Sequence, residues 1–139
     1  MPDSSSIILF AHGARDPQWA DPFLRIRDHL RAARPGIRVD VAFLQSMNPT
    51  LEEAVADHAA AGVTQVLVAP LFFGQGGHLK EDLPLLVARL KGMYPGVVVQ
   101  VTPAAGEVEE LVALIARWVL GEFLTLTDDA GRTAPPQTR

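Results

Sequence analysis

Residues 66–84 read VLVAPLFFGQGGHLKEDLP, and the predicted fold depends on the pattern in this stretch. An apolar run comes first, glycines interrupted only by Gln75 follow, and a charged segment with spaced leucines begins at His78. An unbroken apolar run of this length is typical of a strand buried on both faces, and glycines ahead of a periodic segment indicate a turn into a helix. The stretch therefore predicts one strand–turn–helix unit of a parallel sheet.

The same alternation recurs in the rest of the chain. Further strands are predicted at residues 7–11, 37–44 and 97–102, and apolar residues at three- or four-residue intervals predict helices at about 19–33, 50–61, 83–94 and 108–119. Crossovers between parallel strands are right-handed, so four such units define an α/β fold, a four-stranded parallel sheet flanked by helices on both faces, doubly wound and flavodoxin-like. We expect one domain at residues 1–123 and a disordered tail at residues 124–139, which lack apolar periodicity.

Composition narrows the class of function. The chain has 139 residues, of which 48% are hydrophobic, enough for one ordinary core. Its formal net charge is −4 and it has no basic run, so we expect no nucleic-acid partner. The absence of cysteine leaves His, Asp and Glu as the strong metal ligands. A short apolar run with no basic segment before it predicts neither a signal peptide nor a membrane span, and we expect a cytoplasmic protein.

Two histidines follow predicted strands. His12 follows the first strand, Gln45 the second and His78 the third, each 33 positions from the next. In parallel α/β sheets, ligands bind where the carboxyl ends of the strands meet, so both imidazoles face one cleft if the first and third strands are neighbours. Paired imidazoles indicate a metal site or an acid/base pair. His29 and His58, inside predicted helices, are interpreted as structural or solvated.

The loops that carry these histidines also hold glycines and cations. Gly74, Gly76 and Gly77 either supply positive φ angles for a tight turn or leave bare amides that bind anions at a helix N-terminus. Arg15 and Lys80, beside the two histidines, either hold an anionic ligand or are ordinary surface charges. Neither the Walker pattern nor GxGxxG occurs, so nucleotide binding is poorly supported.

These motifs resemble those of a known family. AHGARDP at residues 11–17 resembles the family sequence HGSRDP of the small, single-domain class II chelatases, which comprise the sirohydrochlorin cobaltochelatases and relatives that insert iron for sirohaem. FLQSMNPTLEEAV at residues 43–55 resembles their second-strand segment, and APLFFGQGGHLKEDLP at residues 69–84 resembles their third-strand block. The resemblance extends from about Ile7 to Leu120.

The resemblance implies a function and a set of site residues. Such an enzyme places a divalent metal, Co²⁺ or alternatively Fe²⁺ or Ni²⁺, into a tetrapyrrole of cobalamin or sirohaem synthesis with loss of two pyrrole protons. The metal is a substrate, and no organic cofactor is expected. His12 and His78 match the catalytic, metal-binding histidines. Two domains form the family's cleft, so a chain of this length is expected to be a homodimer. The groups expected to contact the carboxylated substrate are Arg15, Gln45, Gly76, Gly77 and Lys80. An apolar surface for its ring is expected from Met47, Leu71, Phe72 and Phe73. For both phenylalanines, however, a position in the core is favoured.

One departure from the family leaves alternatives open. Relatives commonly carry glutamate where this chain has Gln45, and an amide is uncharged and cannot accept a proton near neutrality. Ala14 also replaces the usual serine. One alternative is therefore a non-catalytic tetrapyrrole- or metal-binding protein derived from a chelatase. Another, based on the glycine loop alone, is an anion-binding flavodoxin-like module without metal affinity.

Overall fold

A computed structural model describes residues 4–74 and 76–131, and for residues 77, 78, 130 and 131 it describes the backbone only. The chain divides into two compact units, Met1–Ala105 and Gly106–Arg139. The first unit contains the whole sheet, so the predicted α/β fold can be assessed there.

Four parallel strands form the sheet, in the order β2-β1-β3-β4. They span Ser5–Ala11 (β1), Arg38–Phe43 (β2), Gln65–Pro70 (β3) and Val98–Val101 (β4). The prediction of a four-stranded parallel sheet is confirmed, and β1 and β3 are neighbours with Phe10 opposite Pro70. The third strand is shorter than the predicted 66–73. It ends at Pro70, which has no N–H to donate, and one further backbone bond from the Leu71 N–H to the Phe10 carbonyl closes the ladder.

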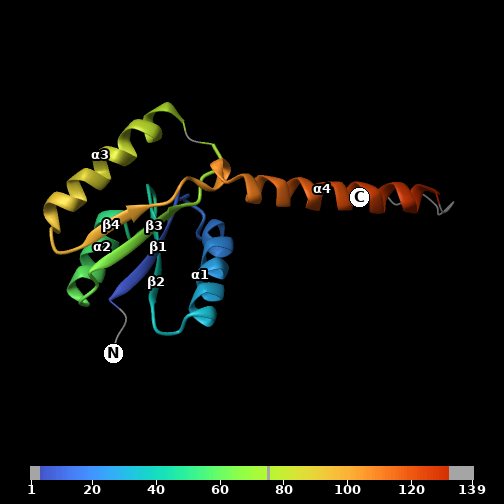
Figure 1. Cartoon of the computed structure of the whole chain (residues 1–139). Helices are drawn as coiled ribbons and strands as arrows, with labels where there is room; N and C mark the ends of the chain where they lie inside the picture. Colours follow the sequence, from blue (N-terminus) through green and yellow to red (C-terminus); the bar gives the residue numbers. More distant parts are fainter. Residues whose placement is uncertain (1–3, 75, 132–139) are drawn as a thin grey trace. The chain divides into compact units, whose positions relative to one another are not determined.

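Helices cover both faces of this sheet. Figure 1 shows α2 (Leu51–Ala60) and α3 (Gly77–Met93) on one side and α1 (Asp21–Ala33) on the other. Side-chain caps mark the starts of two helical segments. The Asp16 carboxylate accepts a hydrogen bond from the Gln18 backbone N–H at the start of the short 3-10 helix η1 (Pro17–Ala20). Thr50 caps α2 in a capping box with Glu53.

The core has two layers because β1 is buried on both faces. Ile8 and Phe10 pack with α2 and α3, whereas Leu9 and Ala11 pack with α1. Alternation along a strand sends successive side chains to opposite faces, so an unbroken apolar run is what a covered parallel strand requires. The strand ends of this rigid layer carry the candidate site.

The second unit is mainly one helix, α4 (Glu109–Gly131), which follows the short 3-10 helix η2 (Ala105–Glu107). The predicted boundary at residue 123 does not coincide with the end of this helix. Residues 124–131, expected in a disordered tail, are helical, and residues 132–139 lie outside the described residues. Among the helices of the described part of the chain, none has the length and apolar character needed to cross a membrane.

Candidate functional site

His12 and Gln45 are brought together by a continuation of the β1–β2 ladder. Beyond the last strand pair, the Leu44 N–H donates to the Ala11 carbonyl (2.9 Å) and the Gln45 N–H donates to the His12 carbonyl (3.1 Å). His12 and Gln45 are both exposed at the carboxyl ends of β1 and β2, and this end of the sheet is called the candidate edge below. The predicted proximity of these two residues is therefore present, with the loops joined through their backbones.

The loop that carries Gln45 is held from below by Glu53. The Glu53 carboxylate accepts hydrogen bonds from the Asn48 side-chain amide (2.8 Å) and the Thr50 N–H (3.0 Å). These bonds, the one from the Thr50 backbone foremost, hold the pKa of Glu53 below its usual value. The Phe43 N–H donates to the Pro49 carbonyl at 2.9 Å, so the loop returns against the end of β2. Its glutamine thus sits on a fixed backbone.

Phe72 supports the His12 ring from beneath. Its ring meets the His12 ring edge to face, with centroids 6.1 Å apart, and packs against Phe10 at 5.5 Å. Phe72 is buried, as favoured, but Phe73 is 67% exposed, so the expectation that Phe73 lies in the core is wrong. The chain has left the sheet after Leu71, so these neighbours no longer alternate across a covered strand. Leu71 and Met47 pack instead against the cluster beneath α1.

The third loop enters α3 without unusual backbone geometry at Gly76. This glycine has φ −61°, so it does not supply the positive φ considered from the sequence, and its carbonyl accepts from the Leu79 and Lys80 amides. Helix α3 begins at Gly77, which places His78 in its first turn. The His78 side chain lies outside the described part of the structure, so its convergence with His12 stays a prediction. The adjacency of β1 and β3 is the observation that favours it.

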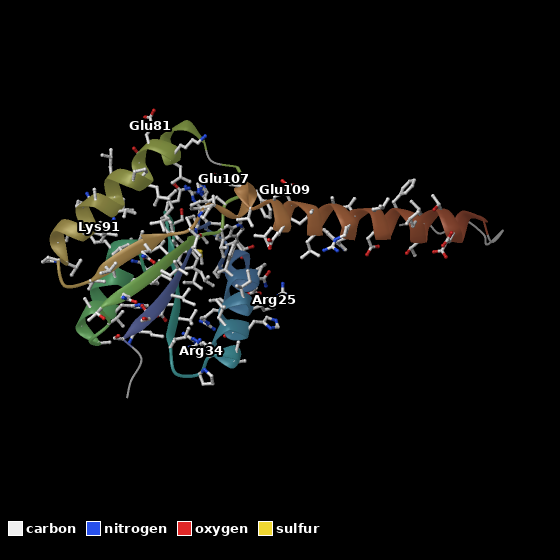
Figure 2. All side chains as sticks on the ribbon, in the orientation of Figure 1. Arg25, Arg34, Glu81, Lys91, Glu107 and Glu109 are labelled. Carbon is white, nitrogen blue, oxygen red and sulfur yellow. The ribbon has the colours of Figure 1, made fainter. Side chains whose placement is uncertain are left out.

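The predicted cations lie on two surfaces. Arg15 is exposed on the loop that follows His12. Lys80 lines a groove of about 400 Å³ along α3 and β4, and Lys91 lies at the other end of the same lining. Figure 2 labels Glu81 near the start of α3 and Lys91 near its end. Lys80 therefore lies on a groove of α3 and β4 whose lining is mainly apolar and includes two lysines.

Sequence reasoning missed an apolar cavity beside the strand ends. Its volume is about 450 Å³, and its walls are Phe10 from β1, Leu44 beside Gln45, and residues of α3 that include four leucines, Asp82 and Arg89. This volume is within the range of small-molecule pockets. The spacing of Leu79, Leu83 and Leu86 signals a helical apolar face but does not reveal that part of the face borders an opening.

His58 belongs to a buried network away from these loops. Its Nε2–H donates to the Asp40 carboxylate at 2.6 Å, which leaves Nδ1 to accept from the Ser6 hydroxyl at 2.6 Å. Burial lowers the pKa of His58, only partly opposed by Asp40. Burial by itself would raise the pKa of Asp40, but His58 and Arg38 outweigh it and the net pKa is lowered. The structural interpretation of His58 is confirmed, and His29 is exposed on α1.

The described residues offer few metal donors at the strand ends. Within the described residues, the structure brings together no group of three or more His, Asp or Glu able to hold a metal. His12 contributes one imidazole and Gln45 one amide oxygen, a set with open coordination positions rather than a closed cage.

Fold and edge together define a class, namely doubly wound parallel α/β proteins with a ligand site at the strand carboxyl ends. Within that class the chain belongs to the CbiX family, whose sequence pattern matches residues 6–120.

Named relatives agree with this family. A sirohydrochlorin cobaltochelatase of Saccharolobus islandicus is 35% identical over 81 residues, which are 58% of this chain and 62% of that protein. One from Methanosarcina acetivorans is 31% identical over 84 residues, 60% of this chain and 65% of the relative. The matched segment thus spans less than two thirds of the length of these relatives.

Solved structures share the fold. The CbiX protein from Marinobacter aquaeolei VT8 superposes with a TM-score of 0.74 at 29% identity, covering 87% of this chain and 98% of that one. SirB from Bacillus subtilis subspecies spizizenii, a sirohydrochlorin chelatase solved with cobalt, gives a TM-score of 0.68 at 24% identity and covers 81% of this chain and 48% of its own. At that identity the likeness to SirB concerns the fold alone.

Proposed function

We propose that this protein is a sirohydrochlorin chelatase that inserts a divalent metal, Co²⁺ in the first instance and Fe²⁺ or Ni²⁺ as alternatives, into the tetrapyrrole of cobalamin or sirohaem synthesis. The observation that carries the proposal is the exposed His12, held beside Gln45 at the carboxyl edge of a sheet whose sequence matches the CbiX family. The relatives named as cobaltochelatases support cobalt as the first metal to test. We assign the protein to the cytoplasm.

In this proposal, His12 and His78 first bind the metal and then accept protons from the macrocycle. Neutral imidazoles bind the incoming ion loosely, with open positions for the ring nitrogens of the macrocycle. Insertion exchanges two pyrrole protons for the metal, and each imidazole that releases the ion becomes a base of suitable strength for one proton. The His12 ring packs edge to face on Phe72, and the residue is exposed.

The macrocycle needs apolar contact and partners for its carboxylates. We propose that its ring lies over the strand edge, with the cavity beside Leu44 taking part of its apolar surface. Arg15, Lys80 and the amides of Gly76 and Gly77 are the groups proposed for the carboxylates, and Gln45 hydrogen-bonds beside the metal. The chain supplies one such edge, and we propose that a second copy completes the cleft in a homodimer.

The direct test is an insertion assay. Purified protein is mixed with sirohydrochlorin and Co²⁺, and the absorbance change of the macrocycle is followed against a protein-free control. The proposal expects a rate well above that control, lost on His12→Ala and retained in an exposed control variant, His29→Ala on α1. A wild-type rate equal to the control would refute it.

A second candidate function follows from Gln45. The site then binds a metal or tetrapyrrole without turnover, because the amide supplies no charge and accepts no proton. Equilibrium titration separates the two functions. A carrier binds sirohydrochlorin or Co²⁺ tightly with no insertion, and Gln45→Glu creates the missing activity.

A further inference from the structure

Gly13 lies between the two residues of the candidate edge, and its backbone is unusual in two respects. It is buried, with φ +92°, a region that side chains other than glycine rarely adopt. A Cβ atom added to it would lie 1.9 Å from the Gln45 carbonyl oxygen and 3.0 Å from the Gln45 carbonyl carbon. Both obstructing atoms belong to backbone, so rotation of a side chain cannot relieve the overlap.

We propose that Gly13 is a positioning residue for metal insertion. Its bare α-carbon lets the loop after β1 close against the loop after β2, and this closure sets His12 beside Gln45. The inference rests on the proposed function of this edge. It adds that the backbones that carry these two side chains form one unit, fixed by the Gly13–Gln45 backbone contact and by the bond from the Gln45 N–H to the His12 carbonyl.

The same chain supplies a control for each requirement. Gly62 has nearly the same φ, +88°, but no atom of the described residues lies within 4 Å of the place that a Cβ atom would take, so Gly62→Ala adds backbone strain without contact. Gly36 has neither the positive φ nor a neighbour within that distance among the described atoms. Gly13→Ala combines strain with an overlap that forces the Gln45 carbonyl to move by about 1 Å.

The expected effect is on chemistry more than on folding. A misplacement of about 1 Å at a reacting centre can cost on the order of 10²-fold in rate. In the Co²⁺ insertion assay we expect Gly13→Ala to lose about that factor in kcat/KM, while Gly62→Ala and Gly36→Ala keep the wild-type value. Circular dichroism and thermal unfolding report the folded fraction, to which each rate is normalised. Equal rates in Gly13→Ala and Gly62→Ala would overturn the inference.

A double-mutant cycle separates positioning from a structural role. If Gly13 acts by placing Gln45 and His12, the losses from Gly13→Ala and Gln45→Ala are coupled, and the double variant loses less than the product of the two. If Gly13 merely stabilises the fold, the losses multiply. Multiplying losses would count against a positioning role.

Amide exchange tests the inference even if Gly13→Ala does not fold or the wild-type protein does not insert metal. The closed arrangement predicts that the Leu44 and Gln45 amides of the wild-type chain exchange as slowly as amides of the β1–β2 ladder, although the Gln45 side chain is exposed. Fast exchange at Gln45 would overturn the inference. A wild-type protein without insertion would refute the proposed function instead.

Discussion

The Nε2 atom of His58 lies 2.6 Å from the Oδ2 atom of Asp40, and the same carboxylate receives Arg38 Nε at 3.1 Å and Arg31 at 3.2 Å. His58 is fully buried, so its ring joins the end of α2 to β1 and β2 through Ser6 and Asp40. This relationship concerns the stability of the sheet and not the candidate site at its strand ends. It therefore predicts variants in which stability and activity respond separately.

Replacing His58 should destabilise the fold without slowing the chemistry. His58→Gln leaves the buried Ser6 hydroxyl and part of Asp40 without their partner, and a buried hydrogen bond to a charged group contributes about 1.5–3 kcal/mol. We expect the free energy of unfolding in urea to fall by about that amount, while the insertion rate per folded molecule stays unchanged. His29→Gln, on the exposed face of α1, should change stability by less than about 0.5 kcal/mol. A His58→Gln protein as stable as wild type would contradict a stabilising role for this network.

Stability should decline in two stages as the pH falls. In the folded state the pKa of His58 is lowered from its usual 6.5. The neutral ring therefore contributes fully to the free energy of unfolding above pH 6.5. As the pH falls further this stability is lost, because the histidine of the unfolded chain takes up a proton before the buried one does. The pKa of Asp40 is lowered from 3.8, so protonation of the unfolded chain at this residue causes a second loss of stability below that pH. Urea unfolding at about pH 7.5 and about pH 5 measures the first stage. His58→Gln should lack it, and equal pH slopes in the two proteins would contradict the assignment.

A carboxylate in place of Gln45 should tighten metal binding. Gln45→Glu puts a negative charge beside His12 at an exposed edge, and we expect the Co²⁺ dissociation constant to fall by about tenfold, equivalent to ~1.4 kcal/mol. Isothermal titration measures the change. Gln100→Glu, which adds the same charge to an exposed position of β4, is the matched control and should leave the constant unchanged. If both variants tighten binding equally, the effect is one of net charge and Gln45 has no special place.

Assembly can be measured independently of activity. Sedimentation equilibrium should give twice the chain mass of 15.0 kDa if a second copy completes the cleft. A single-chain mass at concentrations at which insertion proceeds would contradict the proposed homodimer. Activity from single chains would also confine the site to one sheet edge.

Much of the fold could be predicted from the sequence because burial on both faces leaves unbroken apolar runs. β1 shows this directly, whereas β3 keeps its apolar run although Leu67 is exposed. The helix predicted at about residues 50–61 begins at Leu51, next to its Thr50 cap. Strand ends were less accurate. β3 stops at Pro70 because this residue has no N–H to donate and the chain then turns away from the sheet. Phe72 and Phe73 are apolar, so the sequence does not reveal that turn. The helix at residues 124–131 was missed because its threonines and aspartates mask the periodicity.

Some features of the candidate site could also be predicted from the sequence, and others could not. The equal spacing of His12, Gln45 and His78 correctly placed His12 and Gln45 at one edge, because parallel strands bring their carboxyl ends together. The contact between Gly13 and the Gln45 carbonyl depends on two loops meeting in space, and no local pattern encodes it. The buried position of His58 had a signal, since Leu51, Ala54, Val55 and His58 share one apolar face of α2, but its partners on β1 and β2 come from tertiary packing.

The proposed function depends above all on His12 acting in metal insertion. Its most direct measurement is the rate of Co²⁺ insertion into sirohydrochlorin by wild type and by His12→Ala, with Co²⁺ affinity and folded fraction determined on the same samples. We expect a wild-type rate well above the protein-free reaction and a loss of at least about 10²-fold in the variant, with folding intact. Wild-type turnover in folded His12→Ala would contradict it.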